Sequence, residues 1–468
     1  MRVLVVGGGA REHAIAETLA RAGAEIVVAA NPISPGLGRL AVAHAPIDPT
    51  QPAAVTAFAT SQRVAYAVVG PEAPLAAGVA DALRSAEVPV VGPSKAGAQI
   101  ESSKRFCREL LQKYRIDASP RFIAISNLDE VDARVAEFKV PFVVKPVGLT
   151  SGKGVWVQGA DFASPEEGAS YAKKLLASGT SGVLLEERIE GEEFSQMAFV
   201  TDSGIYPMPA VQDYKRALEG DQGGNTGGMG SYSQRDHLLP FLSRTQRERA
   251  IEILGSAVEA LRQEAIPYRG ILYGGFMLTK EGPVLMEFNA RFGDPESLNA
   301  LTLYEPGDFA ELLLGVAVGR VDPNLLNFRR RATVVKYVVP PGYGAAPSVG
   351  GVLDLDEPAI ADLGVHVYFG AVEAVGPGRV RMGTSRTLAL VGEASAIHEA
   401  SARVDAALPR VRGTYYVRRD IGTRADVAQR VEHIRRLFVP GAKVSPLPLS
   451  VAPPDAPPSS AGTAAQVI

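Results

Sequence analysis

In the first 100 residues, short apolar runs alternate with segments of helical spacing. The runs are rich in β-branched residues and end in turns containing glycine or proline; they span residues 2–6, 25–29, 65–69 and 88–91. This alternation is typical of a parallel sheet with helices on both faces. Such sheets bind ligands at the carboxyl ends of their strands. We therefore predict a Rossmann-like N-terminal domain over residues 1–100, with a ligand site at these turns.

After residue 100 the pattern changes to one typical of an α+β fold with mainly antiparallel strands. A glycine-rich turn separates two of the expected strands and indicates a hairpin. Strands are expected at 141–146, 154–157, 182–187, 195–200, 272–278 and 283–288, and a further region opens at about residue 329 with a strand at 333–339. We predict a central domain over 101–328 and a small C-terminal α+β domain over 329–440. Proline, serine and alanine dominate 446–468, which predicts a disordered tail.

Composition excludes several classes of protein. The 468 residues carry 48 basic and 51 acidic side chains, a net charge of −3, which argues against nucleic-acid binding through bulk positive charge. Cys107 is the single cysteine, so there is no internal disulfide or cysteine-based zinc site. No apolar run reaches the roughly 18–20 residues of a membrane span, and no signal peptide is evident. We expect a cytoplasmic protein without nucleic-acid or membrane partners, as a monomer or small homo-oligomer.

The glycine turn after the first strand is a candidate phosphate site. Gly7-Gly8-Gly9 follows a strand and opens a helix, as in a dinucleotide fingerprint, but Glu12 replaces the third glycine of that motif. Asn31 stands where an acid that binds ribose is expected. Backbone N–H groups at a helix N-terminus favour an anion. We therefore expect a phosphate group here and place a nicotinamide-dependent oxidoreductase last among the alternatives.

A second glycine-rich loop resembles a Walker A motif but departs from it. Gly148 to Gly154 has three residues between its first two glycines instead of four, and Gly154 replaces the Ser or Thr that holds magnesium. The loop also lies between two expected strands and not before a helix. We exclude a P-loop NTPase and expect Lys153 to close over phosphates.

Glu287-Phe288-Asn289 is the strongest candidate for a metal site. Strand alternation puts Glu287 and Asn289 on one face, about 6–7 Å apart. Two hard oxygen ligands suit magnesium, which also binds substrate phosphates. By itself such a triplet is more often a solvated strand end. Its continuation supplies Arg291 and the acidic turn 293–296, which favours a site.

Lysines and glutamates near other strand ends suggest a nucleotide site. Lys104, Lys145 and Lys153 supply three cations able to neutralise a triphosphate. Glu186 and Glu187 end another apolar run, and Glu190 to Glu193 follow. These acids are either an exposed turn or part of an adenosine pocket. In the second case Glu186 meets the adenine edge and a later carboxylate accepts the ribose hydroxyls.

Seven motifs occur in one order from residue 2 to about 430 and resemble the phosphoribosylamine–glycine ligase family, ATP-grasp enzymes of purine synthesis. They are Gly8-Gly9-Ala10-Arg11-Glu12-His13, Gly70-Pro71-Glu72-Ala73-Pro74-Leu75, Gly92-Pro93-Ser94-Lys95, Gly152-Lys153-Gly154, Gln212-Asp213-Tyr214-Lys215-Arg216-Ala217, Asn225-Thr226-Gly227-Gly228-Met229-Gly230 and Glu287 to Glu296. The resemblance implies an ATP-grasp domain over 101–328, with a nucleotide-clamping subdomain at about 118–190. It also implies that ATP, glycine and 5-phosphoribosylamine give glycinamide ribonucleotide, ADP and phosphate through a glycyl phosphate.

The resemblance also implies roles for single residues. Mg²⁺ or Mn²⁺ would bind Glu287 and Asn289, and Arg291, Asp213 and Lys215 would be catalytic. ATP would contact Lys104, Lys145, Lys153, Glu186, Glu187 and Glu193. Phosphoribosylamine would contact Gly8, Gly9, Arg11 and Glu72, and the glycine and acyl-phosphate end would be lined by Asn225, Thr226, Gly227 and Gly228. His13, at the start of a helix, is interpreted as a packing or capping residue.

Departures from the family pattern keep alternatives open. Val147 replaces the usual aspartate before the glycine-lysine loop, and Tyr214 replaces a histidine. Asn31-Pro32 stands where a Gly-Asn pair is more usual. The nearest alternative is a paralogue that joins a different carboxylic acid to an amine. An idle ATP-binding scaffold is disfavoured, because it would not need Lys145, Glu287, Asn289 and Arg291 together.

Overall fold

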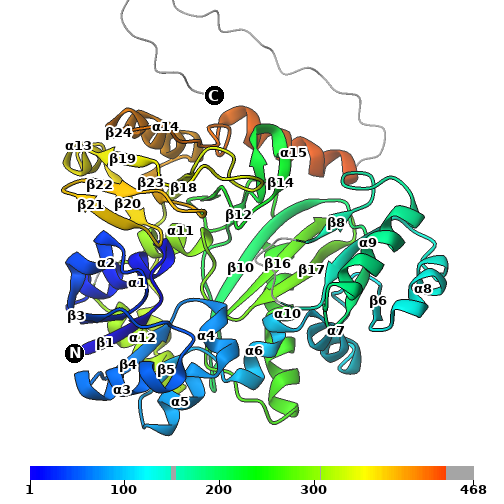
Figure 1. Ribbon diagram of the computed structural model, residues 1–468, viewed down its shortest axis with the longest axis horizontal. Helices are drawn as coiled ribbons and strands as arrows, with labels where there is room; N and C mark the ends of the chain where they lie inside the picture. The colour runs from blue at the N-terminus through cyan, green and yellow to red at the C-terminus, as the bar shows by residue number, and fades with distance from the viewer. Residues whose placement is uncertain (149–153, 306, 439–468) are drawn as a thin grey trace, which may run out of the picture.

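The N-terminal region is a five-stranded, fully parallel sheet (Figure 1) in the computed structural model, which describes residues 1–148, 154–305 and 307–438. The strand order is β3-β2-β1-β4-β5, with β1 at Arg2–Val6, β2 at Glu25–Ala29, β3 at Ala41–Ala45, β4 at Tyr66–Val69 and β5 at Val90–Val91. The predicted parallel sheet is confirmed. Strand β3 was not predicted, because this edge strand is half-exposed and its Ala-Val-Ala-His-Ala pattern has no continuous apolar run.

Helices cover both faces of this sheet. They are α1 (Ala10–Arg21), α2 (Pro35–Leu40), α3 (Pro52–Gln62), α4 (Glu72–Ala77), α5 (Val79–Ser85) and α6 (Lys95–Ser102). Two later helices, α11 (Glu296–Leu303) and α12 (Phe309–Val318), pack against the same region. The hydroxyl of Tyr66 donates a hydrogen bond of 2.9 Å to the carbonyl of Ala310. The parallel sheet is therefore buried by helices from both halves of the chain.

The central region begins with a small antiparallel sheet that has its own apolar core. Its order is β6-β9-β7-β8, with β6 at Phe122–Ile125, β7 at Phe142–Pro146, β8 at Trp156–Val157 and β9 at Val183–Glu187. Helices α8 (Val131–Glu137) and α9 (Pro165–Ala177) pack on it, and α7 (Lys104–Lys113) leads into it. The predicted β7–β8 hairpin is present. The predicted contact of Lys153, in the loop between these strands, lies outside the described residues.

A second antiparallel sheet carries the Glu287-Phe288-Asn289 motif. Its order is β11-β10-β16-β17, with β10 at Glu192–Thr201, β11 at Gly204–Pro207, β16 at Gly270–Thr279 and β17 at Gly282–Asn289. Helix α10 (Arg244–Gln263) packs against it. Figure 1 shows this sheet between the small β6–β9 sheet and the N-terminal region, so the ends of its strands lie among all the other parts.

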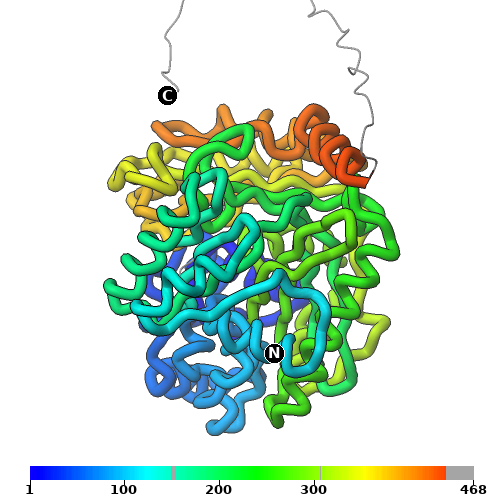
Figure 2. The backbone as a smooth tube through the Cα atoms, turned by 90° about the vertical axis from the view of Figure 1, so that its right-hand side faces the viewer, coloured from blue at the N-terminus to red at the C-terminus, as the bar shows by residue number. Residues whose placement is uncertain are grey.

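The C-terminal region is built around a sheet shared with the central region. Its order is β12-β15-β18-β23-β20. Strands β12 (Gln212–Asp213) and β15 (Gly230–Ser233) precede the predicted domain boundary at residue 329, yet they share this sheet with β18 (Ala332–Val338), which follows it. Figure 2 shows this region, yellow to red, at the end of the molecule opposite the blue N-terminal helices. Further elements are β13 (Arg216–Leu218), β14 (Gln222–Asn225), β19 (Val352–Leu355), β20 (Val365–Phe369), β21 (Glu373–Gly376), β22 (Arg379–Arg381), β23 (Leu388–Ala394), β24 (Val411–Arg412), α13 (Glu357–Ala361), α14 (Ile397–Ala407) and α15 (Arg424–Phe438).

None of the helices in the described ranges has the length and apolarity needed to cross a bilayer. The disordered tail predicted for 446–468 lies outside those ranges.

Candidate active site

The end of β17 places the predicted metal ligands beside an anchored arginine. Phe288 is buried in the core, whereas the side chain of Glu287 is 40% exposed. The Arg291 guanidinium donates to Asn289 Oδ1 at 2.9 Å and pairs with Glu101 at 3.0 Å and Glu72 at 3.4 Å. Although burial opposes the charge, Glu101 and Glu72 raise the pKa of Arg291. Arg291 therefore stays cationic and joins β17 to the N-terminal region.

A buried ion-pair triad holds Lys145. The Glu186 carboxylate accepts from Lys145 Nζ at 2.5 Å and from Arg108 Nε at 2.6 Å. Arg108 also donates to the carbonyl of Met286 on β17 at 2.6 Å. Burial opposes ionisation of Glu186, but Arg108 and Lys145 lower its pKa to about 2. Both carboxylate oxygens are thus engaged by cations, so Glu186 fixes the position of the Lys145 ammonium group.

Lys215 lies among three carboxylates. Its Nζ is 3.1 Å from Glu193, 3.6 Å from Glu287 and 3.8 Å from Asp213. Burial raises the pKa of Asp213 to about 7; Lys215 opposes this shift, and Glu296 adds to it. These groups come from β10, β12 and β17 and the residues that follow them, so the fold assembles the cluster from segments far apart in sequence.

The cations and the metal-ligand candidate share one electrostatic environment. Desolvation opposes ionisation of Glu287, but Lys215, Lys145, Lys104 and Arg291 together lower its pKa. Lys104, at the start of α7, donates to the carbonyl of Gly148 at 2.8 Å, and burial lowers its pKa. Glu187, at the end of β9, is half-exposed. The structure thus brings together Lys104, Lys145, Lys215 and Glu287, which come from four separate segments of the chain.

The glycine turn after β1 is tightly packed. A Cβ on Gly8 would lie 2.5 Å from the carbonyl oxygen of Pro32. The Gly9 N–H donates to Glu12 at 2.7 Å, and Glu12 also pairs with Arg11 Nε at 2.6 Å. Arg11 further donates to the carbonyl of Phe292 at 3.2 Å. Glu12 thus accepts a hydrogen bond from one of the N–H groups that were expected to face a phosphate, a role that its sequence position did not predict.

The glycine-rich loop after β14 is fixed from the C-terminal region. Thr226 Oγ1 donates to the carbonyl of Lys215 at 2.8 Å. Arg386 donates to the carbonyls of Gly227 at 2.7 Å and Gly228 at 3.2 Å, and pairs with Asp294 at 2.9 Å. Asn225, which ends β14, lies opposite Arg216 in the antiparallel pairing of β14 with β13. No motif identified Arg386, because it lies far in sequence from the loop that it contacts.

Two family models match the chain. The phosphoribosylglycinamide synthetase N domain matches residues 1–101, and the ATP-grasp (A) domain of phosphoribosylglycinamide synthetase matches residues 102–297. The chain belongs to the phosphoribosylglycinamide synthetase family. It is therefore an ATP-grasp ligase, which uses ATP and a divalent metal and acts on small molecules, as the sequence motifs predicted.

Relatives of this family member match along most of its length. The phosphoribosylamine–glycine ligase of Thermococcus gammatolerans is 44% identical over 92% of this chain and 97% of that protein. The ligase of Methanoregula boonei is 44% identical over 93% of this chain and 100% of that protein. The crystal structure of phosphoribosylamine–glycine ligase from Thermotoga maritima has a TM-score of 0.75 at 28% identity, and covers 90% of this chain and 100% of that one. The predicted ligase of purine biosynthesis is confirmed.

Proposed function

We propose that this chain joins glycine to 5-phosphoribosylamine, with ATP converted to ADP and phosphate, to give glycinamide ribonucleotide. The observation that carries the proposal is the position of Glu287 among Lys215, Lys145, Lys104 and Arg291. Four cations around one partly exposed carboxylate suit a polyphosphate and its metal. The names of the relatives supply the acid and the amine.

The chemistry requires activation of glycine before the bond to nitrogen forms. A carboxylate oxygen is a poor leaving group, so transfer of the γ-phosphoryl group of ATP to that oxygen gives glycyl phosphate and ADP. The amine of phosphoribosylamine then attacks the carbonyl carbon, the C–O bond to phosphate breaks, and the nitrogen loses a proton. In this reaction the protein contributes positioning and charge neutralisation.

We assign the nucleotide to the face of the β6–β9 sheet that carries Lys145 and Glu186. Lys145 and Lys104 would hold the phosphates, with Lys153 from the adjacent loop. Because its carboxylate is paired twice, Glu186 would act through Lys145 and not on adenine directly. Glu187 would lie towards the adenosine end, and Glu193 would contact the nucleotide from beside Lys215.

The donor atoms at the end of β17 fit a hard divalent cation. Glu287 supplies a partly exposed carboxylate and Asn289 an amide oxygen with a second lone pair beyond its bond to Arg291. Among the described residues no group of three His, Cys, Asp or Glu side chains could hold a metal alone, so substrate oxygens would complete the ligand set. Mg²⁺ or Mn²⁺ bound there would neutralise phosphate charge. Arg291 and Lys215 would stabilise the transferring phosphoryl group, with Asp213 orienting Lys215.

The remaining substrates occupy neighbouring surfaces in this proposal. Gly8, Gly9, Arg11 and Glu72 would bind phosphoribosylamine, and the loop Asn225, Thr226, Gly227 and Gly228 would line the glycine end. We retain the division into residues 1–100, 101–328 and 329–440, with the shared β12–β15–β18 sheet joining the last two. The chain would act in the cytoplasm as a monomer or small homo-oligomer.

A screen of the pure protein for ADP release tests this function, with the carboxylic acid and the amine varied independently. We expect ADP only when glycine, phosphoribosylamine and a divalent metal are all present. ADP release that ignores glycine but rises with another acid would replace our proposal by the paralogue. AMP and pyrophosphate as products would contradict ATP-grasp chemistry.

A further inference from the structure

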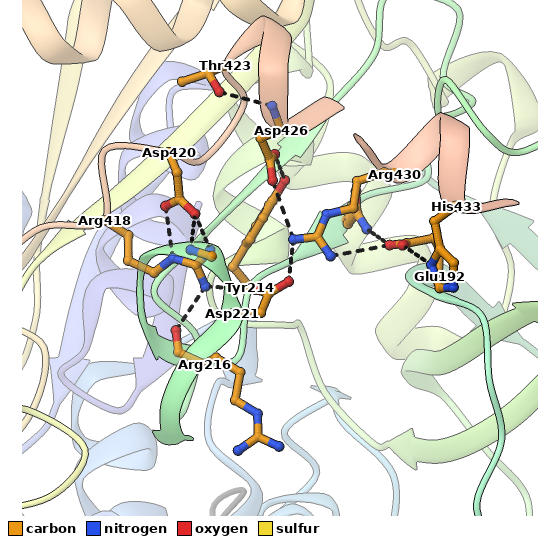
Figure 3. A network of polar contacts seen from close by, with 12 residues as sticks. Glu192, Tyr214, Arg216, Asp221, Arg418, Asp420, Thr423, Asp426, Arg430 and His433 are labelled. Atoms are coloured by element: carbon orange, nitrogen blue, oxygen red, sulfur yellow. Dashed lines mark hydrogen bonds and ion pairs between the residues drawn. The ribbon is translucent and has the colours of Figure 1, made fainter. Parts of the chain in front are cut away.

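Helix α15, the last in the described ranges, contacts Tyr214 and Glu192, which are the sequence neighbours of Lys215 and Glu193. Asp426, Arg430 and His433 lie on α15 and point into the polar network of Figure 3. Only 16% of the Arg430 side chain is exposed. No motif or assigned role in the proposed reaction includes these residues.

Tyr214 connects the first site segment to α15. Its ring lies between the guanidinium groups of Arg418 and Arg430 (Figure 3). The Cζ atoms of these arginines are 5.0 and 5.1 Å from the ring centroid. The Tyr214 hydroxyl donates to Asp426. Side chains alternate along an extended segment, so Tyr214 points to α15 while its neighbours Asp213 and Lys215 point to the cluster with Glu193 and Glu287.

Glu192 connects the second site segment to the same helix. Its carboxylate accepts from His433 Nδ1 at 2.6 Å and from Arg430 at 3.4 Å. The next residue on β10, Glu193, points the other way and contacts Lys215 Nζ at 3.1 Å. In both segments, therefore, one residue (Tyr214 or Glu192) contacts α15 and the next residue (Lys215 or Glu193) belongs to the Lys215 cluster.

Arg430 joins these two segments. Besides Glu192 and the ring of Tyr214, it pairs with Asp221 at 2.5 Å and Asp426 at 3.4 Å. A planar guanidinium fixes direction as well as charge, because it stacks on an aromatic face and donates in a fork. Arg430 thus bridges the segment that carries Glu193 and the segment that carries Lys215, which the backbone hydrogen bonds between Ser195 and Val211 also join.

We propose that Arg430 is a positioning residue for the ligase reaction, holding Tyr214 and Glu192 so that Lys215 and Glu193 keep the geometry needed for phosphoryl transfer. The inference rests on the proposed function of the Lys215 cluster. A displacement of about 1 Å in such a cluster can cost on the order of 100-fold in rate. A buried arginine paired with several carboxylates often stabilises a fold no more than apolar residues of similar volume do. Stability alone therefore does not explain the presence of Arg430.

The test compares R430M with R435M, a matched substitution on the same helix. Arg435 is exposed and pairs only with Glu432 within the described residues, so R435M keeps the wild-type rate. We expect R430M to lower kcat about 10- to 100-fold. The KM for phosphoribosylamine should stay within about 2-fold, because its proposed contacts at Gly8, Gly9 and Arg11 are remote from α15. R430K restores the charge without the planar fork and should recover only part of kcat.

Thermal melting accompanies every assay, and Y214F serves as the milder variant. It removes only the hydroxyl bonded to Asp426, and we expect kcat to fall several-fold with little change in melting temperature. If R430M does not fold, the kcat of Y214F decides. Wild-type kcat in a folded R430M, or in Y214F, would overturn the inference, as would loss of activity that simply follows the unfolded fraction. If the wild type makes no glycinamide ribonucleotide, the proposed function fails, and the same variants are compared with the acid and amine that do release ADP.

Discussion

The buried histidine of α1 predicts how stability depends on pH. His13 Nδ1 accepts the backbone N–H of Phe369 at 3.0 Å, so the C-terminal region docks on a neutral imidazole. The ring also stacks on Phe369 at 5.9 Å and meets the edge of Tyr368 at 5.4 Å. Burial lowers the pKa of His13 from 6.5 to about 4; Glu17 opposes this shift and Arg39 adds to it.

The direction and size of the effect follow from proton linkage. Between pH 6.5 and 4 the unfolded chain binds a proton at His13 that the folded chain does not, so stability rises with pH across this window. The contribution is complete above pH 6.5 and falls by about 1.4 kcal/mol for each pH unit below it. Acidification from pH 7 to pH 5 crosses about 1.5 units of the window, which costs about 2 kcal/mol.

Urea denaturation followed by circular dichroism, at pH 7 and pH 5, measures this cost. H13Q keeps an acceptor for the Phe369 N–H but does not titrate. It loses the ring contacts with Phe369 and Tyr368, so we expect H13Q to be less stable than the wild type at pH 7. That difference should shrink by about 2 kcal/mol at pH 5. The control H44Q removes an exposed histidine from the same region and should leave the pH dependence as in the wild type. A difference between wild type and H13Q that is equal at both pH values would refute the linkage argument.

Three further substitutions and metal removal test other parts of the structure. E287Q should reduce metal-dependent ADP release by several orders of magnitude without unfolding the chain, whereas E281Q, exposed at the β16–β17 turn, should keep activity in the same assay. E186Q leaves two buried cations facing each other and should lower the free energy of unfolding by about 3–5 kcal/mol in urea titrations; a loss below about 1 kcal/mol would contradict the triad. G36A places a Cβ 2.0 Å from the imidazole of α1 and should cost about 1–3 kcal/mol, while G38A, with its nearest neighbour at 4.0 Å, should melt like the wild type. A chelator should abolish ADP release and leave the far-ultraviolet circular dichroism spectrum unchanged; ADP release that persists would exclude a role for the metal.

Much of the fold followed from local pattern. The apolar runs that became β1, β2 and β4 alternate with helices, and the turns that follow them lie at one edge of the parallel sheet. The β7–β8 hairpin was predicted from its glycine-rich turn. Strand β3 was not, because an edge strand with one side exposed needs no apolar run.

The contacts of the buried charged side chains could be predicted less well from the sequence. Of the two interpretations of Glu186, an exposed turn or a contact with adenine, neither included its ion pairs with Arg108, 78 positions earlier, and with Lys145. Arg386 and Arg430 belong to no recognised motif, although Arg386 contacts the glycine-rich loop at Gly227 and Arg430 contacts Glu192 on β10. Their partners are set by strand order and helix docking, and neither feature has a local signature.

By itself the sequence determined which residue types stand at strand ends and which face each one takes, because alternation and turn chemistry act over a few neighbouring residues. It also determined the family, through motifs spread along the chain. Only the tertiary structure decided which charges meet. Glu192 and Arg430 lie 238 positions apart, and their contact depends on how α15 packs against β10 and on the low cost of pairing charges that are already desolvated.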